Sequence, residues 1–417
     1  MANRRQNAGR DPAPRSLISR RDFLKLSGAA AGALLVGGKP AVAATAAPPL
    51  ALVNLTLVDG TGAPPVADAA VVVAEGRILA AGPRARVKIP TGIAVLDMGG
   101  ATLLPGFINA HVHAGYAGLT LEAWARGGVT TVRDLGALGT YSSKLFEARD
   151  ALCANPRCAR LVAVGSFINV SGGYPIAYWN GFAVTADTPA EVRQQVNRLI
   201  DDGAEVIKTA FESGYTFNRS GWPLLPPETA KALVAAAHER GVPVTAHVTS
   251  ARDLPLALDA GVDEIAHMVV DPCSQELIQR AVEAGIRWVP TLELWQGVSR
   301  MHKIDYDKVA VENLSRFVAA GGEVAMGTDY AGAPMSFELG MTLTEIRLMA
   351  AAGMRPLQII TAATRNAARA CNREGDLGVV AAGKTADLLV VDGDPLTDLD
   401  TLGRASLVMR AGRIIPV

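Results

Sequence analysis

The feature that most constrains the fold is a regular alternation of short β-rich runs with helical patterns from Pro105 to about Asp329. Such alternation is typical of βαβ units that build a parallel sheet. One intervening segment, Thr188-Pro189-Ala190-Glu191, carries the capping box and early proline that begin a helix. Eight β-rich runs predict an α/β protein with a (β/α)8 TIM barrel. The predicted strand cores are Gly106–His111, Val129–Arg133, Leu161–Ser166, Val206–Thr209, Val242–His247, Glu264–Met268, Trp288–Leu292 and Val324–Thr328.

Two flanking segments do not fit the barrel pattern. Residues 52–104 and 376–417 are rich in Val, Ile and Leu and are interrupted by glycine turns. Neither segment is expected to form a stable sheet alone, because isolated hairpins are marginal in water. We therefore predict that both chain ends join in one small β-sandwich beside the barrel. The predicted domains are a β-sandwich made from residues 44–104 and 376–417, and a barrel over residues 105–375.

The first residues have the pattern of a targeting segment. Arg20-Arg21 lies within a twin-arginine signature, an apolar stretch covers Leu26–Gly38, and Ala41-Val42-Ala43 offers a cleavage site. We predict a twin-arginine signal peptide over residues 1–43 and a periplasmic or exported protein. The alternative is an uncleaved anchor. Because the apolar stretch is much shorter than the ~20 residues of a spanning helix, we favour removal and no stable membrane insertion afterwards.

Charge and cysteine content narrow the class of protein further. Lys plus Arg and Asp plus Glu both number 40, so there is no basic surplus to indicate a nucleic-acid partner. Four cysteines are present, and Cys153 and Cys158 are close enough in sequence to form a disulfide in the periplasm. Folding in a reducing cytoplasm before transport favours free thiols instead.

Potential metal ligands follow several predicted strands at their carboxyl ends, where barrel enzymes keep their chemistry. Two form an H-x-H pair, and alternate residues of a strand share one face. The residues that end predicted strands one, four, five, six and eight are His111 with His113, Lys208, His247, His267 and Asp329. The remaining two histidines, His238 in a helix and His302 in a loop, are interpreted as ordinary surface or packing residues.

Each of these residues taken alone is common in a protein core, but the set is not. Four imidazoles, an ammonium and a carboxylate converging on one end of a barrel would be costly unless a charged group organised them. Two divalent metal ions would do so. Zinc is the expected metal for a site of imidazole and oxygen ligands.

The order of these ligands along the chain resembles the binuclear amidohydrolase superfamily. The segments 104–113, 128–134 and 383–388 are similar to those of its imidazolonepropionase-like and prolidase-like branch, and the similarity runs from Leu52 to the C-terminus. The resemblance implies that His111, His113 and Asp329 bind the more buried metal, and that His247 and His267 bind the other. It also implies that Lys208 is carboxylated by carbon dioxide and that the resulting carbamate bridges the two ions.

The same resemblance implies a hydrolase that cleaves an amide or peptide-like carbon–nitrogen bond of a small molecule. A hydroxide bridging the metals would be the nucleophile, and Asp329 would carry its proton to the leaving amine. A homo-oligomer is expected. The alternatives are an esterase or lactonase that uses the same site, and a metal-free binding protein on this fold.

Two loops depart from the prolidase-like pattern. Tyr174 stands where many relatives have histidine, and the segment Phe211-Glu212-Ser213-Gly214-Tyr215 lacks the usual second glycine. These departures argue against dipeptidase activity. Tyr174 and Tyr215 are therefore candidate substrate contacts, although loop aromatics could equally pack a lid.

Overall fold

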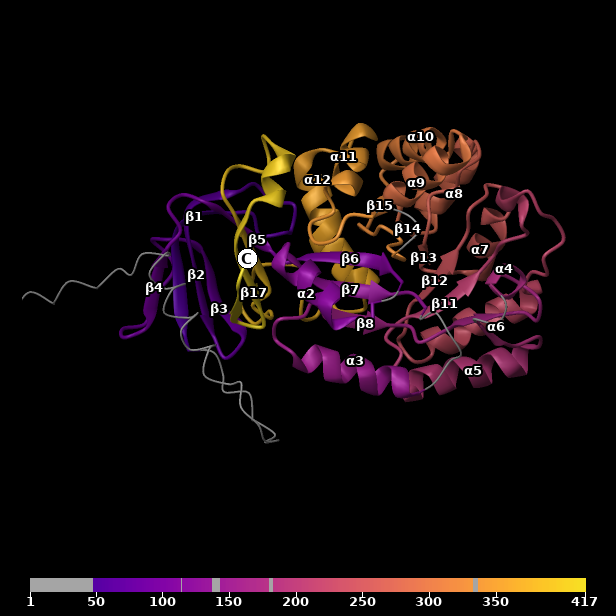
Figure 1. Ribbon diagram of the computed structural model, residues 1–417, viewed down its shortest axis with the longest axis horizontal. Helices are drawn as coiled ribbons and strands as arrows, with labels where there is room; N and C mark the ends of the chain where they lie inside the picture. Colours follow the sequence, from indigo (N-terminus) through magenta and orange to yellow (C-terminus); the bar gives the residue numbers. More distant parts are fainter. Residues whose placement is uncertain (1–47, 114, 137–142, 180–182, 333–336) are drawn as a thin grey trace, which may run out of the picture.

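The protein was analysed as a computed structural model that describes residues 48–113, 115–136, 143–179, 183–332 and 337–417. The predicted signal peptide over residues 1–43 lies outside these ranges. Within them, a sheet made from both chain ends lies at one side of a larger α/β part (Figure 1). No helix in the described ranges is long and apolar enough to cross a membrane.

The first sheet joins residues from the two ends of the chain. Its strands follow the order β18-β17-β16-β5-β1-β2-β3, and β4 pairs with β1. Strands β5 and β16 run antiparallel, with Leu103 opposite Val390. Figure 1 accordingly shows the indigo strands and the yellow strands side by side. The bounds are β1 Leu50–Leu57, β2 Val66–Ala74, β3 Arg77–Pro83, β4 Ala94–Asp97, β5 Thr102–Pro105, β16 Leu388–Val391, β17 Ala405–Arg410 and β18 Arg413–Ile415.

The predicted joining of the chain ends is thus observed, as one eight-stranded sheet. Apolar side chains alternate along β1 between two core clusters, with Leu50 and Leu52 in one and Ala51 and Val53 in the other. This alternation follows from the period of two along a strand. A sandwich of two sheets stays a prediction.

The larger part has the parallel strands of a TIM-barrel-type fold. They form a three-stranded sheet in the order β6-β7-β8 and a seven-stranded sheet in the order β10-β9-β11-β12-β13-β14-β15. The predicted third strand is divided into β8 and β9, with Gly165 at a positive φ of 80° between them. The bounds are β6 Phe107–Val112, β7 Val129–Asp134, β8 Arg160–Ala163, β9 Phe167–Asn169, β10 Ala183–Thr185, β11 Ile207–Ala210, β12 Val244–His247, β13 Glu264–Ile265, β14 Arg287–Trp288 and β15 Glu323–Val324.

Backbone hydrogen bonds also link the segment that follows the seven-stranded sheet to the three-stranded sheet. Ala110 donates to the Met326 carbonyl at 2.8 Å, and His113 donates to the Tyr330 carbonyl at 2.6 Å. A parallel bridge between Val112 and Tyr330 lies at the same seam. The segment after β15 is therefore held against β6, which carries the H-x-H pair.

Helices surround these strands (Figure 1). The predicted capping box of α5 is observed, since Glu191 donates its backbone N–H to Thr188 Oγ1 and Thr188 donates to the Glu191 carboxylate. The bounds are α2 Gly118–Arg126, α3 Lys144–Ala154, α4 Ile176–Trp179, α5 Pro189–Asp202, α6 Pro227–His238, α7 Leu254–Ala260, α8 Gln275–Glu283, α9 Leu292–His302, α10 Tyr306–Ala319, α11 Leu343–Ala351, α12 Pro356–Thr361 and α13 Ala367–Ala370, with short η1 Tyr215–Phe217, η2 Ala362–Asn366 and η3 Leu399–Gly403.

The state of the four cysteines decides between a disulfide and free thiols. Cys153 and Cys158 are both free, as are Cys273 and Cys371. The Cys153 thiol instead accepts a hydrogen bond from the Leu161 backbone N–H at 3.3 Å. Free thiols, rather than a disulfide, are what folding in a reducing compartment favours.

Candidate metal centre

The six predicted ligands lie in five parallel strands or in the residues that follow them. His111 lies in β6, Lys208 in β11 and His247 at the end of β12. His267 follows β13 by two residues and Asp329 follows β15 by five, because these two strands are shorter than predicted. Lys208 was predicted to end its strand, but it is the second residue of β11, which continues to Ala210. The other five ligands lie at or just after the carboxyl ends of their strands, as predicted.

His111, His113 and Asp329 form a compact group. Asp329 Oδ1 lies 3.1 Å from His111 Nε2 and 3.1 Å from His113 Nε2, and the two Nε2 atoms are 3.4 Å apart. The ligand atoms of this group all lie within 4.8 Å of one another. Two imidazole nitrogens and a carboxylate oxygen at this spacing suit a divalent transition metal.

The two other histidines adjoin this group. The His267 ring centroid lies 4.7 Å from that of His111 and 4.6 Å from that of His247. His267 Nδ1 is 4.0 Å from Asp329 Oδ2. The structure therefore brings all four predicted histidines together around Asp329.

The outer ring nitrogens of three histidines are already engaged. His111 Nδ1 lies 2.8 Å from the Ala266 carbonyl, and His113 Nδ1 lies 2.8 Å from the Gly136 carbonyl. His267 Nδ1 lies 3.0 Å from Thr291 Oγ1. A hydrogen bond to one ring nitrogen fixes the tautomer and leaves the other nitrogen free to bind a metal. Each of these rings thus has its Nε2 available.

Burial keeps most of these rings neutral. It lowers the pKa of His111 to about 3, against the opposing effect of Asp329, and it also holds the pKa of His267 well below the usual range. For Asp329, burial alone would raise the pKa, but the adjacent His111 and His113 outweigh it and hold it well below the usual range. Neutral imidazole and ionised carboxylate are the forms that bind metals.

Lys208 is the most unusual member of the set. Its side chain is fully buried, and among the described residues its Nζ has no hydrogen-bond partner. Nζ lies 5.4 Å from the Phe167 ring centroid. Burial lowers the pKa of Lys208 to about 7. A large fraction of this amine is therefore unprotonated at neutral pH, which is the form that reacts with carbon dioxide.

The backbone at Asp329 is in a conformation that is unusual for a non-glycine residue. Its φ is 59°, and its N–H donates to the His111 carbonyl at 2.9 Å. Strained backbone of this kind gathers at functional sites and costs ~1–3 kcal/mol. Gly327 permits the approach, since a Cβ there would lie 2.8 Å from the His111 backbone nitrogen.

The structure adds Glu212, which the sequence analysis noted only as part of an unusual segment. Its buried carboxylate accepts hydrogen bonds from the Gly214 backbone at 2.8 Å and from the Thr249 hydroxyl, and it lies 3.6 Å from His247 Nε2. Burial alone would raise the pKa of Glu212, but His247 and the two hydrogen-bond donors outweigh this effect. The pKa is therefore lower than usual, and Glu212 is ionised. Glu212 thus lies beside the Nε2 of His247.

The two predicted substrate contacts differ in placement. Tyr174 is nearly buried, and its ring stacks on His247 with centroids 4.0 Å apart and planes 17° apart. Tyr215 is 52 % exposed, and the Arg252 guanidinium lies 6.0 Å from its ring centroid. Tyr174 is therefore at the site, whereas Tyr215 lies at the protein surface.

The two histidines excluded from the predicted site lie elsewhere. His238 ends α6 and its Nε2 lies 2.8 Å from an Asp263 carboxylate oxygen, with both side chains substantially exposed. His302 is exposed at the end of α9, not in a loop as predicted.

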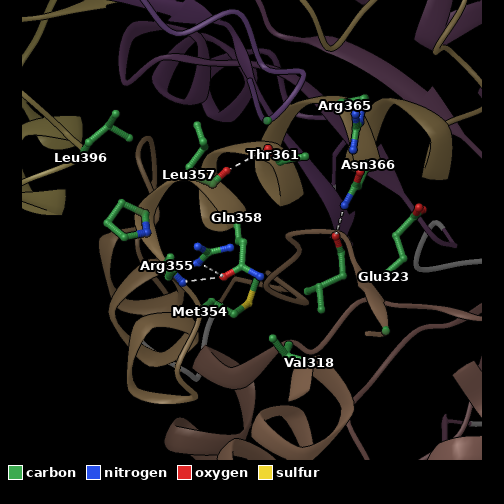
Figure 2. A pocket seen from close by; sticks show the side chains of 14 residues that line it. Val318, Glu323, Met354, Arg355, Leu357, Gln358, Thr361, Arg365, Asn366 and Leu396 are labelled. Atoms are coloured by element: carbon green, nitrogen blue, oxygen red, sulfur yellow. Dashed lines mark hydrogen bonds between the residues drawn. The ribbon is translucent and has the colours of Figure 1, made fainter. Parts of the chain in front are cut away.

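A separate cavity of about 540 Å³ lies away from these residues (Figure 2). Glu323 and Val324, the residues of β15, contribute to its wall together with Arg355, Gln358 and Asn366. It therefore lies at the amino end of β15, whereas the active sites of barrel enzymes lie at the carboxyl ends of the strands. The cavity is not part of the candidate metal centre.

Fold and side chains together define a TIM-barrel-type α/β protein with a histidine-rich centre at the strand ends. The model of the amidohydrolase family matches residues 102–415, so the chain belongs to this family. It is therefore an enzyme of the amidohydrolase class, and the predicted relationship is confirmed.

Individual relatives agree with this assignment. The chain is 27% identical over 352 residues to the ochratoxinase of Aspergillus niger, covering 71% of each protein. It is 26% identical over 362 residues to the imidazolonepropionase of Deinococcus radiodurans, covering 79% of this chain and 86% of that protein. The structure of a putative prolidase from Bifidobacterium longum is 29% identical, with a TM-score of 0.74 over 89% of this chain and 95% of that one.

The model of the twin-arginine translocation signal matches residues 17–37. The prediction of export by the twin-arginine pathway is thus confirmed. Cleavage after Ala43 stays a prediction.

Replacing Arg20-Arg21 with two lysines should leave the protein in the cytoplasm, folded and able to bind metal, because only the transport signal changes. Cell fractionation and metal analysis of the cytoplasmic protein check this result. Unchanged periplasmic accumulation would show that another feature directs export.

Proposed function

We propose that the protein is an exported, metal-dependent hydrolase that cleaves a carbon–nitrogen bond of a small amide or peptide-like substrate. The observation that carries this proposal is the convergence of four histidines, Asp329 and a buried lysine that has no hydrogen-bond partner among the described residues. Membership of the amidohydrolase family supports it independently.

The residues fit two divalent ions, with zinc as the expected metal. His111, His113 and Asp329 would hold one ion, and His247 and His267 the other. In the part of the chain that the structure describes, the buried Nζ of Lys208 and Nε2 of His247 have no hydrogen-bond partner. This supports the assignment, because a buried polar atom without a partner is costly unless another group satisfies it. Such ions would polarise the scissile carbonyl and provide hydroxide near neutral pH.

Lys208 would bridge the ions as a carbamate. Its unprotonated Nζ attacks the carbon of carbon dioxide and loses one proton, which leaves a carboxylate with two oxygen donors. A protonated ammonium has no lone pair to offer. The pKa near 7 and the burial of Nζ support this step.

Asp329 would move the proton during hydrolysis. As water adds to the scissile carbonyl, the Asp329 carboxylate accepts one proton and then donates it to the leaving nitrogen as the C–N bond breaks. Glu212 would place a negative charge beside His247, with a carboxylate oxygen 3.6 Å from its Nε2.

We also infer the finer architecture. The hydrogen bonds between the segment after β15 and β6 support closure of the eight strands into a (β/α)8 barrel over residues 105–375. The sheet from residues 44–104 and 376–417 would be a separate small domain, a β-sandwich, beside it. A homo-oligomer remains part of the proposal.

The mature protein should contain about two transition-metal ions per chain and hydrolyse amides. A chelator should abolish hydrolysis, and zinc or manganese should restore it, because both the supply of hydroxide and carbonyl polarisation would depend on the ions. Elemental analysis and assays with N-acyl amino acids, dipeptides and lactones check this. Full activity in metal-free protein would refute the mechanism, and hydrolysis of lactones alone would assign the site to ester bonds.

A further inference from the structure

Five aromatic rings form a continuous surface beside the metal centre. Only 5% of the residues in the chain are aromatic, yet these rings contact one another in a series that runs outward from the metal centre. Tyr174 lies 6.2 Å from Phe167, 5.9 Å from Phe217 and 6.0 Å from Trp222, measured between ring centroids. Tyr178 lies 4.9 Å from Phe217. We call this surface the aromatic wall; its members are Phe167, Tyr174, Tyr178, Phe217 and Trp222.

The inner end of the wall touches the proposed metal ligands. The Tyr174 ring stacks on His247 at 4.0 Å, and the Phe167 ring lies parallel to His113, with planes 9° apart and centroids 6.4 Å apart. A molecule with its reacting bond at the metal centre would therefore have the wall beside it.

The outer end of the wall is open to solvent. Phe167 and Tyr174 are 7% and 9% exposed, whereas Tyr178 is 46% exposed and Phe217 and Trp222 are partly exposed. A cluster that served only to hold loops together would bury these rings more completely. Clustered apolar side chains at the surface beside a catalytic site commonly bind an apolar part of a ligand.

The wall is built by segments that follow two strands. Phe167 lies in β9, Tyr174 and Tyr178 in the segment leading into and through α4, and Phe217 in η1 after β11. Loops at the carboxyl ends of barrel strands are the elements that set substrate choice in this type of fold. The position of the wall thus suits a specificity-determining surface.

We propose that the preferred substrate carries an aromatic ring adjacent to its scissile carbon–nitrogen bond, and that this ring packs on the aromatic wall. The inference rests on the proposed function and extends it to a substrate class. Aromatic pairs favour offset or edge-to-face packing with centroids ~4.5–7 Å apart. The wall already has this spacing, and packing there would orient the carbonyl towards the metal centre.

The test compares matched substrates in the holoenzyme. The pairs are N-benzoylglycine with N-acetylglycine, and N-acetylphenylalanine with N-acetylalanine. We expect kcat/KM to favour the aromatic member of at least one pair by about tenfold, since each ring contact contributes roughly two- to tenfold. Trp222→Ala and Phe217→Ala should reduce this preference through KM. Both variants should keep the metal content, because neither residue is a proposed ligand.

A matched control separates specific from general effects. Leu79→Ala removes a side chain with 54% exposure in β3, away from the wall, and should leave the preference unchanged. Circular dichroism checks that each variant is folded, and Trp222→Leu replaces Trp222→Ala if the latter is not. Equal kcat/KM within both pairs, or an unchanged preference in both wall variants, would overturn the inference while the proposed function stands.

Failure of the proposed function has a different signature. If metal-loaded protein hydrolyses no amide, the proposed reaction is wrong and the wall is tested by binding alone. Calorimetry with N-benzoylglycine and N-acetylglycine then measures the preference. Tighter binding of the benzoyl compound that is lost in Trp222→Ala supports the wall, and equal affinities overturn it.

Discussion

Lys208→Ala should lower both the metal content and the turnover of the enzyme. The substitution removes the one ligand that both ions would share, so the remaining histidines and Asp329 leave each ion with too few donors. It also removes the anion that would screen the repulsion between two dications. Elemental analysis and kcat measured on the same preparation check the result. The exposed Lys231→Ala on α6 is the control and should change neither quantity.

Chemical rescue makes this prediction specific to a carbamate. Acetate or propionate should enter the space left by the side chain and restore part of the activity, because each supplies two carboxylate oxygens. Lys208→Arg should resist rescue, since its guanidinium occupies the space and stays charged. Reconstitution of the wild-type apoprotein should be faster with bicarbonate. Two bound metals and normal turnover in Lys208→Ala would exclude a bridging role.

Asp329→Asn should retain the fold and lose most of the rate, with a smaller effect on substrate binding. An amide cannot accept the proton that a carboxylate accepts, and proton transfer by a positioned side chain typically contributes ~10²–10⁴-fold. That loss corresponds to ~3–5 kcal/mol of transition-state stabilisation. Steady-state kinetics check the prediction.

Metal analysis accompanies this variant because Asp329 is also a proposed ligand. A loss of rate in protein that keeps its metals assigns the effect to proton transfer, and a loss of both assigns it to binding. A variant within threefold of the wild-type rate would remove Asp329 from the mechanism.

The ligand set could be predicted from the sequence because it follows from strand geometry. His111 and His113 are two residues apart at the end of a β-rich run, so both side chains face the same way. His247 and Lys208 lie in short apolar strands, whose β-branched residues have a high propensity for β-structure. Convergence at one end then follows from the parallel arrangement that the helices between them require.

Other features depend on backbone conformations that residue type does not reveal. Thr291 and Asp329, which follow β14 and β15, both have positive φ, at 50° and 59°. The two strands end at Trp288 and Val324, before these residues, so the predicted last strands are too long. Non-glycine residues rarely adopt this conformation, and only their tertiary contacts stabilise it there.

The role of Glu212 and the difference between the two tyrosines also escaped prediction. Glu212 alternates with Lys208 and Ala210, so a period of two could have placed it on the same face, but a carboxylate after a strand is usually solvated. Tyr174 and Tyr215 look equivalent in sequence as loop aromatics. Their exposure is set by the packing of separate loops against His247, which local pattern does not encode.

The pairing of β5 with β16 has a consequence for the order of events in the cell. Leu103 and Val390 are opposite each other although they are about 290 residues apart, so the ribosome makes β1 to β5 long before their neighbour exists. Until then β5 presents an open edge of the kind that invites aggregation. Completion of the sheet therefore requires translation through β18. A pathway that carries folded cargo would in this way receive only chains in which these strands have been made.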